Sequence, residues 1–120
     1  MSLTNFSRSI SGHIAVVTGA ASGMGEATAK LFASEGALVA AIDVNEEGLN
    51  RVVDEISSEG KSAKGWILDL SDGGEIKRVF DEIAEHFGGI DILVNNAGIS
   101  IPSPIDDDNT RAIGLDLWTY

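Results

Sequence analysis

The sequence predicts an α/β fold built on a doubly wound parallel sheet. Three observations lead to this prediction. Apolar runs recur about every 26 residues, a length that suits one strand plus one crossover helix. The segments between the runs carry apolar residues at helical spacing. A glycine-rich or polar motif follows each run, where the carboxyl ends of parallel strands meet.

Four runs rich in Val, Ile and Ala are predicted strands, over residues 13–18, 38–43, 63–69 and 90–95. Near-continuous apolar runs are typical of parallel strands that are covered on both faces. With right-handed crossovers, the pattern βαβαβαβ forms an open sheet. For a doubly wound, Rossmann-like fold the strand order is 3-2-1-4, and the sheet is partial.

Three helices are predicted between these strands, each with one apolar face. The faces comprise Met24, Ala27, Leu31 and Phe32; Leu49, Val52, Val53 and Ile56; and Ile76, Val79, Phe80, Ile83 and Phe87. Gly36, Gly60 and Gly88 follow the helices, where a left-handed residue commonly ends a helix. Asp72 and Glu75 resemble a capping box before the third helix.

Length and composition restrict the classes of function. The 120 residues predict one domain, 1–120, in which residues 1–11 form a polar N-terminal extension without the apolar core of a signal peptide. A net charge of −11 argues against binding to nucleic acid or to an anionic membrane. The absence of cysteine excludes disulfides and thiolate metal sites, and it fits a cytoplasmic protein.

The segment 18–25, Thr-Gly-Ala-Ala-Ser-Gly-Met-Gly, follows the first predicted strand and opens the first helix. Gly19 allows a tight turn, and Gly23 and Gly25 remove side chains where a pyrophosphate would approach the backbone. Amide groups near Ser22, Met24 and Gly25 would face the phosphates at the helix N-terminus. The alternative is an ordinary glycine-rich turn.

Asp43 ends the second predicted strand, 18 residues after Gly25. A carboxylate at this place can accept hydrogen bonds from the adenosine ribose and repels a 2′-phosphate, which favours NAD over NADP. No Arg or Lys for a 2′-phosphate is supplied by Ala20, Ala21, Ser22 or Val44. The alternative role for Asp43 is to cap the helix that follows.

The third and fourth strands end on further polar motifs. Asp69 can accept the adenine amino group while Leu70 covers the ring, or Asp69 is a turn or cap residue. The segment 95–98, Asn-Asn-Ala-Gly, ends the fourth strand. The amide side chains of Asn95 and Asn96 can tie this strand to neighbouring backbone, and Gly98 lets the chain pass close to a ligand. The alternative for this segment is a common Asn/Gly turn.

Other candidates predict no site. The run Asp106–Asn109 lacks the alternating spacing of a calcium loop and precedes a possible helix, so no metal site is expected. His13 and His86 have no evident catalytic partner, and Trp66 is expected in the core.

These motifs together resemble the short-chain dehydrogenase/reductase family over about residues 12–117, nearly the whole chain. Segment 18–25 resembles its cofactor turn and segment 95–98 its motif after strand 4. Asp43 and Asp69 match the family's acidic positions for the ribose and the adenine. The resemblance implies an NAD-dependent oxidoreductase that transfers hydride between the nicotinamide and an alcohol or ketone substrate.

The chain departs from the family in its catalytic residues. The resemblance implies a Tyr-x-x-x-Lys pair, but Tyr120 is the only tyrosine and the last residue. Asp116 stands where the family has an Asn on its fourth helix. We therefore expect a truncated chain that is inactive alone. An uncovered edge on the fourth strand would promote self-association or leave the chain marginally stable, and a homo-oligomer is expected.

Two other classes of function are possible. The first is a non-catalytic nucleotide-binding or interaction module. The second is a methyltransferase that binds S-adenosylmethionine, because that class also has a glycine-rich first turn. The spacing of segment 18–25 and the presence of segment 95–98 argue against a methyltransferase.

Overall fold

The computed structural model describes residues 10–96 of the chain. Within them, strands and helices alternate along the chain. The order is β1 (Ile14–Thr18), α2 (Gly23–Ser34), β2 (Leu38–Asp43), α3 (Glu46–Ser58), β3 (Ala63–Ile67), α4 (Gly73–Phe87) and β4 (Ile92–Asn95). The third strand ends two residues earlier than predicted, and the fourth begins two residues later.

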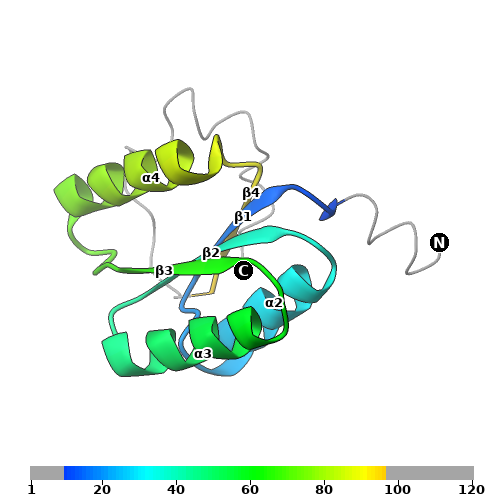
Figure 1. Ribbon diagram of the computed structural model, residues 1–120. Helices are drawn as coiled ribbons and strands as arrows, with labels where there is room; N and C mark the ends of the chain where they lie inside the picture. The colour runs from blue at the N-terminus through cyan, green and yellow to red at the C-terminus, as the bar shows by residue number, and fades with distance from the viewer. Residues whose placement is uncertain (1–9, 97–120) are drawn as a thin grey trace.

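The four strands form one parallel sheet in the order β3-β2-β1-β4, which confirms the predicted fold class (Figure 1). The register aligns the carboxyl ends of the strands. Thr18 at the end of β1 pairs with Ile42 of β2 and with Asn95 of β4. Asp43 pairs with Ile67 at the end of β3. Polar residues far apart in the sequence therefore meet at one edge of the sheet.

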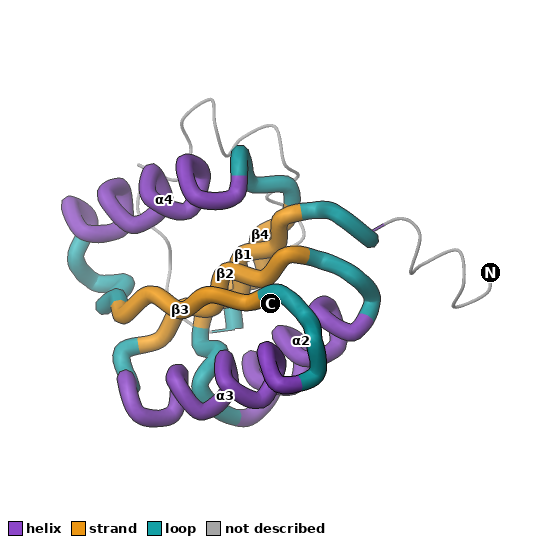
Figure 2. Tube along the Cα trace, viewed as in Figure 1, coloured by secondary structure: helices purple, strands orange, loops and turns teal. Residues whose placement is uncertain are grey.

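Helices cover both faces of this sheet, α4 on one side and α2 with α3 on the other (Figure 2). Strand residues alternate between the two layers. Val16 and Ile42 pack in the cluster that contains the buried face of α4, whereas Val17 and Val39 pack in the cluster of α2 and α3. This two-sided burial explains why the strands are apolar along nearly their whole length.

The ends of α3 and α4 follow local rules. Asn45 accepts a hydrogen bond from the Gly48 N–H and caps α3, and Asp72 accepts one from the Glu75 N–H and caps α4. The reciprocal half of the predicted capping box is wrong, because Glu75 forms an ion pair with Arg78 and the Asp72 N–H donates to the Asp69 carbonyl. The predicted left-handed glycines after the three helices are confirmed.

The predicted apolar face of α2 is confirmed only at Phe32, which packs against the core. Met24 is 76% exposed and Leu31 is 50% exposed. The helix buries Gly25, Ala29 and Ala33 instead. These small residues let α2 lie close to the sheet. A search for the periodicity of large apolar side chains cannot predict a buried face made of small residues. The predicted faces of α3 and α4 are confirmed, since Leu49, Val52 and Ile56 of α3, and Ile76, Val79, Phe80 and Ile83 of α4, are buried.

The small residues on the buried face of α2 lead to a stability prediction. Ala29→Leu is expected to lower the free energy of unfolding by about 2 kcal/mol, because the added side chain has no space between α2 and the sheet. Leu31→Ala, the control on the exposed face, is expected to change it by at most about 0.5 kcal/mol. Urea unfolding of both variants checks this, and equal losses would contradict the assignment of the buried face.

Residues 10 and 11 were predicted to belong to the N-terminal extension, but they contact the fold. Ile10 is buried, and Ser11 lies against Gly36 after α2. The Gly12 N–H donates to the Gly36 carbonyl. Trp66 is in the core as predicted, with its Nε1 donating to Glu82. No helix within residues 10–96 is both long and apolar enough to cross a bilayer.

Candidate functional site

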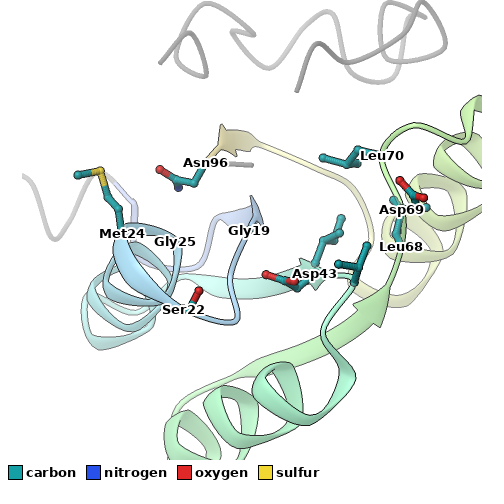
Figure 3. Close-up of a pocket in the computed structure, with 11 residues that line it drawn as sticks. Gly19, Ser22, Met24, Gly25, Asp43, Leu68, Asp69, Leu70 and Asn96 are labelled. Carbon is teal, nitrogen blue, oxygen red and sulfur yellow. The ribbon is translucent and has the colours of Figure 1, made fainter. Parts of the chain in front are cut away.

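A cavity of about 340 Å³ lies over the carboxyl ends of the strands (Figure 3). In Figure 3, Met24 and Asn96 stand on one side of Gly19, and Asp43, Asp69 and Leu70 on the other. The lining residues come from all four strand ends and from the start of α2: Gly19, Ser22, Met24, Gly25, Ile42, Asp43, Val44, Leu68, Asp69, Leu70 and Asn96. The parallel register thus brings eight of the eleven predicted site residues to one cavity.

The glycine-rich turn forms the floor of this cavity. Gly19 has φ 66° and Gly23 has φ 58°, conformations that favour glycine. A Cβ on Gly25 would lie 1.8 Å from the Gly19 carbonyl oxygen, so only glycine fits there. A Cβ on Gly23 would meet no protein atom within 4 Å. The backbone at Gly23 is therefore open to a molecule from outside, although Gly23 itself does not line the cavity.

The N-terminus of α2 differs from those of the other two helices. Ser22 occupies the N-cap position but forms no side-chain cap hydrogen bond. In contrast, Asn45 and Asp72 cap α3 and α4. The first N–H groups of a helix have no partner within it, and they carry the positive end of its dipole. This end of α2 faces the cavity and can accept an anion.

Asp43 connects the end of β2 to the turn. Its Oδ2 accepts from the Ala21 N–H at 2.9 Å, and its Oδ1 accepts from the Asn45 N–H at 3.0 Å. The alternative role of Asp43 as the cap of α3 is excluded, because Asn45 is the cap. The carboxylate is half-buried at the cavity wall, and each oxygen can accept a further hydrogen bond.

Asp69 lies at the opposite end of the cavity from the turn. Its Oδ1 accepts from both the N–H and the hydroxyl of Ser71, and these bonds lower the pKa of Asp69. The carboxylate is exposed and ionised near neutral pH. Leu70 is only 4% exposed and packs in the core, so it presents little surface to a ring. Asp69 thus forms a turn with Ser71, one of the two alternatives, and still lines the cavity.

Asn95 and Asn96 have different environments. The Thr18 hydroxyl donates to Asn95 Oδ1 at 2.8 Å and accepts from the Asn96 N–H at 3.0 Å, which ties β4 to β1. Asn95 is buried and does not line the cavity, so the structure does not place it at the predicted site. Asn96 does line the cavity, and its Nδ2 is buried without a hydrogen-bond partner.

Three lining residues, Ile42, Val44 and Leu68, were not predicted from the sequence. Each of them is adjacent in the sequence to a predicted site residue. Their position at the end of a strand was the sequence feature that could have identified them. An ion-pair network next to the turn was also not predicted. It is formed by Glu26, Lys30, Arg51 and Glu55. This network joins α2 to α3, and its pairs between the two helices are 25 residues apart in the sequence. Residue spacing within one helix cannot predict such pairs.

Glu26 is the central carboxylate of this network. Hydrogen bonds from Arg51 and Lys30 lower the pKa of Glu26 from 4.5 to about 2. A carboxyl whose pKa is lower in the folded state stabilises the fold above its unfolded pKa. This contribution is lost as the pH falls through the folded pKa.

A pH dependence of stability is therefore expected. In the wild type, the contribution of Glu26 is complete above about pH 4.5 and disappears towards about pH 2. The stability difference between wild type and Glu26→Gln should shrink across this window. Urea unfolding at steps between these pH values measures it. A difference that stays constant down to about pH 2 would contradict the lowered pKa of Glu26.

Some predicted positions lie outside the described residues. These are Gly98, the run Asp106–Asn109, Asp116 and Tyr120. Within residues 10–96, no group of three or more His, Cys, Asp or Glu side chains is placed to hold a metal ion.

The fold and the cavity define the Rossmann-like α/β class, in which ligands bind outside the carboxyl ends of the strands. A family model described as short chain dehydrogenase matches residues 13–114. The chain belongs to the short-chain dehydrogenase family, which confirms the resemblance drawn from the sequence.

Several relatives support this assignment. The chain is 37% identical to D-threitol dehydrogenase of Mycolicibacterium smegmatis, over 92% of this chain and 45% of that protein. It is 44% identical to 2,3-dihydro-2,3-dihydroxybenzoate dehydrogenase of Bacillus subtilis, over 82% of this chain and 38% of that protein. The chain thus spans less than half the length of these relatives.

Solved structures also support the family assignment. A metagenomic short-chain oxidoreductase in complex with NADP matches with a TM-score of 0.72 and 40% identity, over 76% of this chain and 41% of that one. An actinorhodin polyketide ketoreductase variant with NADPH matches with a TM-score of 0.69 and 37% identity, over 72% of this chain and 33% of that one.

Proposed function

We propose that the chain is the cofactor-binding part of an oxidoreductase that transfers hydride between a nicotinamide dinucleotide and an alcohol or ketone. The observation that carries this proposal is the cavity at the strand ends, into which the uncapped N-terminus of α2 opens. The bound cofactor supplies the hydride chemistry, and the chain's residues bind and orient it.

The turn and α2 are proposed to hold the pyrophosphate. The free N–H groups at the start of α2 donate to phosphate oxygens, and the helix dipole favours the negative charge. Gly23 leaves open space over the backbone, and Gly25 lets the helix start close to Gly19. Met24 and the unpartnered Asn96 Nδ2 would contact the cofactor on the same side of Gly19.

The adenosine is proposed to lie between Asp43 and Asp69. Asp43 accepts from the ribose hydroxyls, and Asp69 accepts from the adenine amino group. Val44 is exposed at the cavity wall and can cover the ring together with the edge of Leu70. Gly98 remains a predicted site residue, and Asn95 would act indirectly, by tying β4 to β1.

NAD is the cofactor we propose, although the similar structures named above contain NADP or NADPH. The comparisons therefore give no reason to prefer NAD. The preference rests on Asp43, whose charge opposes a 2′-phosphate. Its position is fixed by two backbone N–H groups, so it cannot easily turn away from the ribose.

Catalysis by this chain alone is not proposed, because its sequence contains no Tyr-x-x-x-Lys. A non-catalytic nucleotide-binding module remains the alternative function. We also propose that the protein is a cytoplasmic homo-oligomer. Within residues 10–96, β4 is paired on one side only, and such an edge can pair with another chain.

Calorimetric titration of the chain with NAD, NADP and S-adenosylmethionine tests the proposed function. We expect binding of NAD, weaker binding of NADP and no binding of S-adenosylmethionine. Absorbance of NADH with a panel of ketones should show no turnover. Absence of binding to either dinucleotide would overturn the proposal, and turnover would overturn the expectation that catalysis needs other residues.

A further inference from the structure

The glycine-rich turn is held from behind by Arg51, a residue of α3. Its Nη2 donates to the Ala21 carbonyl at 3.3 Å and to Glu26 Oε1 at 2.9 Å, while its Nη1 donates to Glu26 Oε2 at 3.1 Å. The Ala21 N–H donates to Asp43. Both polar backbone groups of Ala21 are therefore fixed, one by Asp43 and the other by Arg51.

Glu26 poses an electrostatic problem for the proposed site. It lies in the first turn of α2, where a carboxylate suits the helix dipole but opposes an anionic ligand at the same end. Arg51 Nη2 donates both to this carboxylate and to the Ala21 carbonyl, so the carboxylate lies close to the glycine-rich turn. Its low pKa keeps it ionised near neutral pH.

The ion-pair network resolves this problem. Arg51 and Lys30 each contact both Glu26 and Glu55, so two cations balance two carboxylates. If Arg51 is removed, Lys30 alone must serve both carboxylates. The network then carries one uncompensated negative charge beside the helix end that would receive a diphosphate.

We propose that Arg51 is a positioning residue for the phosphate-binding turn, which neutralises Glu26 and holds the Ala21 carbonyl so that α2 can accept a diphosphate. This inference rests on the proposed function. Arg51 is half exposed and contacts Glu26 rather than the cavity, so it acts through the turn.

The test compares Arg51→Met with Arg78→Met. Arg78 forms the same kind of ion pairs with two glutamates on α4, is similarly exposed and does not line the cavity, so its loss is a matched control. Affinities for NAD and ADP are measured by calorimetry, and for adenosine, which has no phosphate, by NMR titration. Arg51→Met should weaken the binding of NAD and of ADP about fivefold and the binding of adenosine less than about twofold. Screened charge effects of this size are typical near a surface. Arg78→Met should change none of them by more than about twofold.

Two further variants keep the test decisive if Arg51→Met folds poorly. Arg51→Lys retains the charge and should keep ADP affinity within about twofold of wild type. Adding Glu26→Gln to Arg51→Met removes the uncompensated charge and should recover most of the lost ADP affinity.

Three results would overturn the role of Arg51: unchanged ADP affinity in Arg51→Met, an equal loss for adenosine, or no recovery with Glu26→Gln. A wild-type chain that binds neither NAD nor ADP would instead overturn the proposed function, and this inference with it. The two failures are distinguishable because the wild type is measured first.

Discussion

Gly25→Ala is expected to lower the free energy of unfolding by about 3 kcal/mol and to abolish NAD binding. The new Cβ would lie 1.8 Å from the Gly19 carbonyl oxygen and 2.5 Å from its carbon. Both are backbone atoms, so the clash can be relieved only by moving α2 away from the turn. That movement displaces the helix N-terminus from the cavity. Urea unfolding and calorimetric titration with NAD measure the two effects.

Two other glycines supply controls for this substitution. Gly73→Ala, at the start of α4, meets no atom within 4 Å and has no positive φ, so we expect no loss of stability. Gly60→Ala also has space but has φ 77°, and it should cost about 1 kcal/mol from backbone strain alone. If Gly25→Ala were no more destabilising than Gly60→Ala, the close approach of α2 to Gly19 would be wrong.

Asp43→Asn is expected to raise the ratio of NADP to NAD affinity about tenfold, which corresponds to about 1.4 kcal/mol. The substitution removes the negative charge that opposes a 2′-phosphate and keeps the shape of the side chain. In the wild type the two carboxylate oxygens of Asp43 accept from the Ala21 and Asn45 N–H groups. The amide side chain in the variant keeps only one of these acceptors. Stability should therefore fall by about 1 kcal/mol. Titration with both dinucleotides and urea unfolding check these results.

Asp43→Ala separates charge from hydrogen bonding. It removes both acceptors, so it should lose more stability than Asp43→Asn while shifting the cofactor ratio by a similar factor. Asp69→Asn is the control at the far end of the cavity, and it should leave the ratio unchanged. An unchanged ratio in both Asp43 variants would remove Asp43 from the ribose site.

The strands and their order were predictable because they depend on local and repeated signals. Four apolar runs at a constant spacing leave few arrangements once crossovers are right-handed. The faces of α3 and α4 were also predictable, since large apolar residues mark their buried sides. The buried face of α2 was not predictable, because its buried residues are Gly25, Ala29 and Ala33, which are small and carry little hydrophobic pattern.

The candidate site was predicted in part. Gly19, Asp43 and Asp69 follow strands, and parallel pairing brings such positions together whatever their separation in the sequence. Asn95 was predicted to tie the fourth strand to its neighbours and also to line the site. The structure shows a bond to Thr18, 77 residues away, that ties β4 to β1, and Asn95 does not line the cavity. A side chain of this type can bind a ligand or join two strands, and only the strand register decides between them.

The sequence by itself determined the parallel α/β fold, the family and the places where the chain turns beside a ligand-sized cavity, because these depend on periodicity and on residues that few turns accept. The tertiary structure alone decided which side chains face the cavity and which support it. Arg51 reaches Glu26 and Ala21 across 25 and 30 residues of sequence. Such contacts arise from the packing of α3 against α2, so no pattern of neighbouring residues in the sequence can predict them.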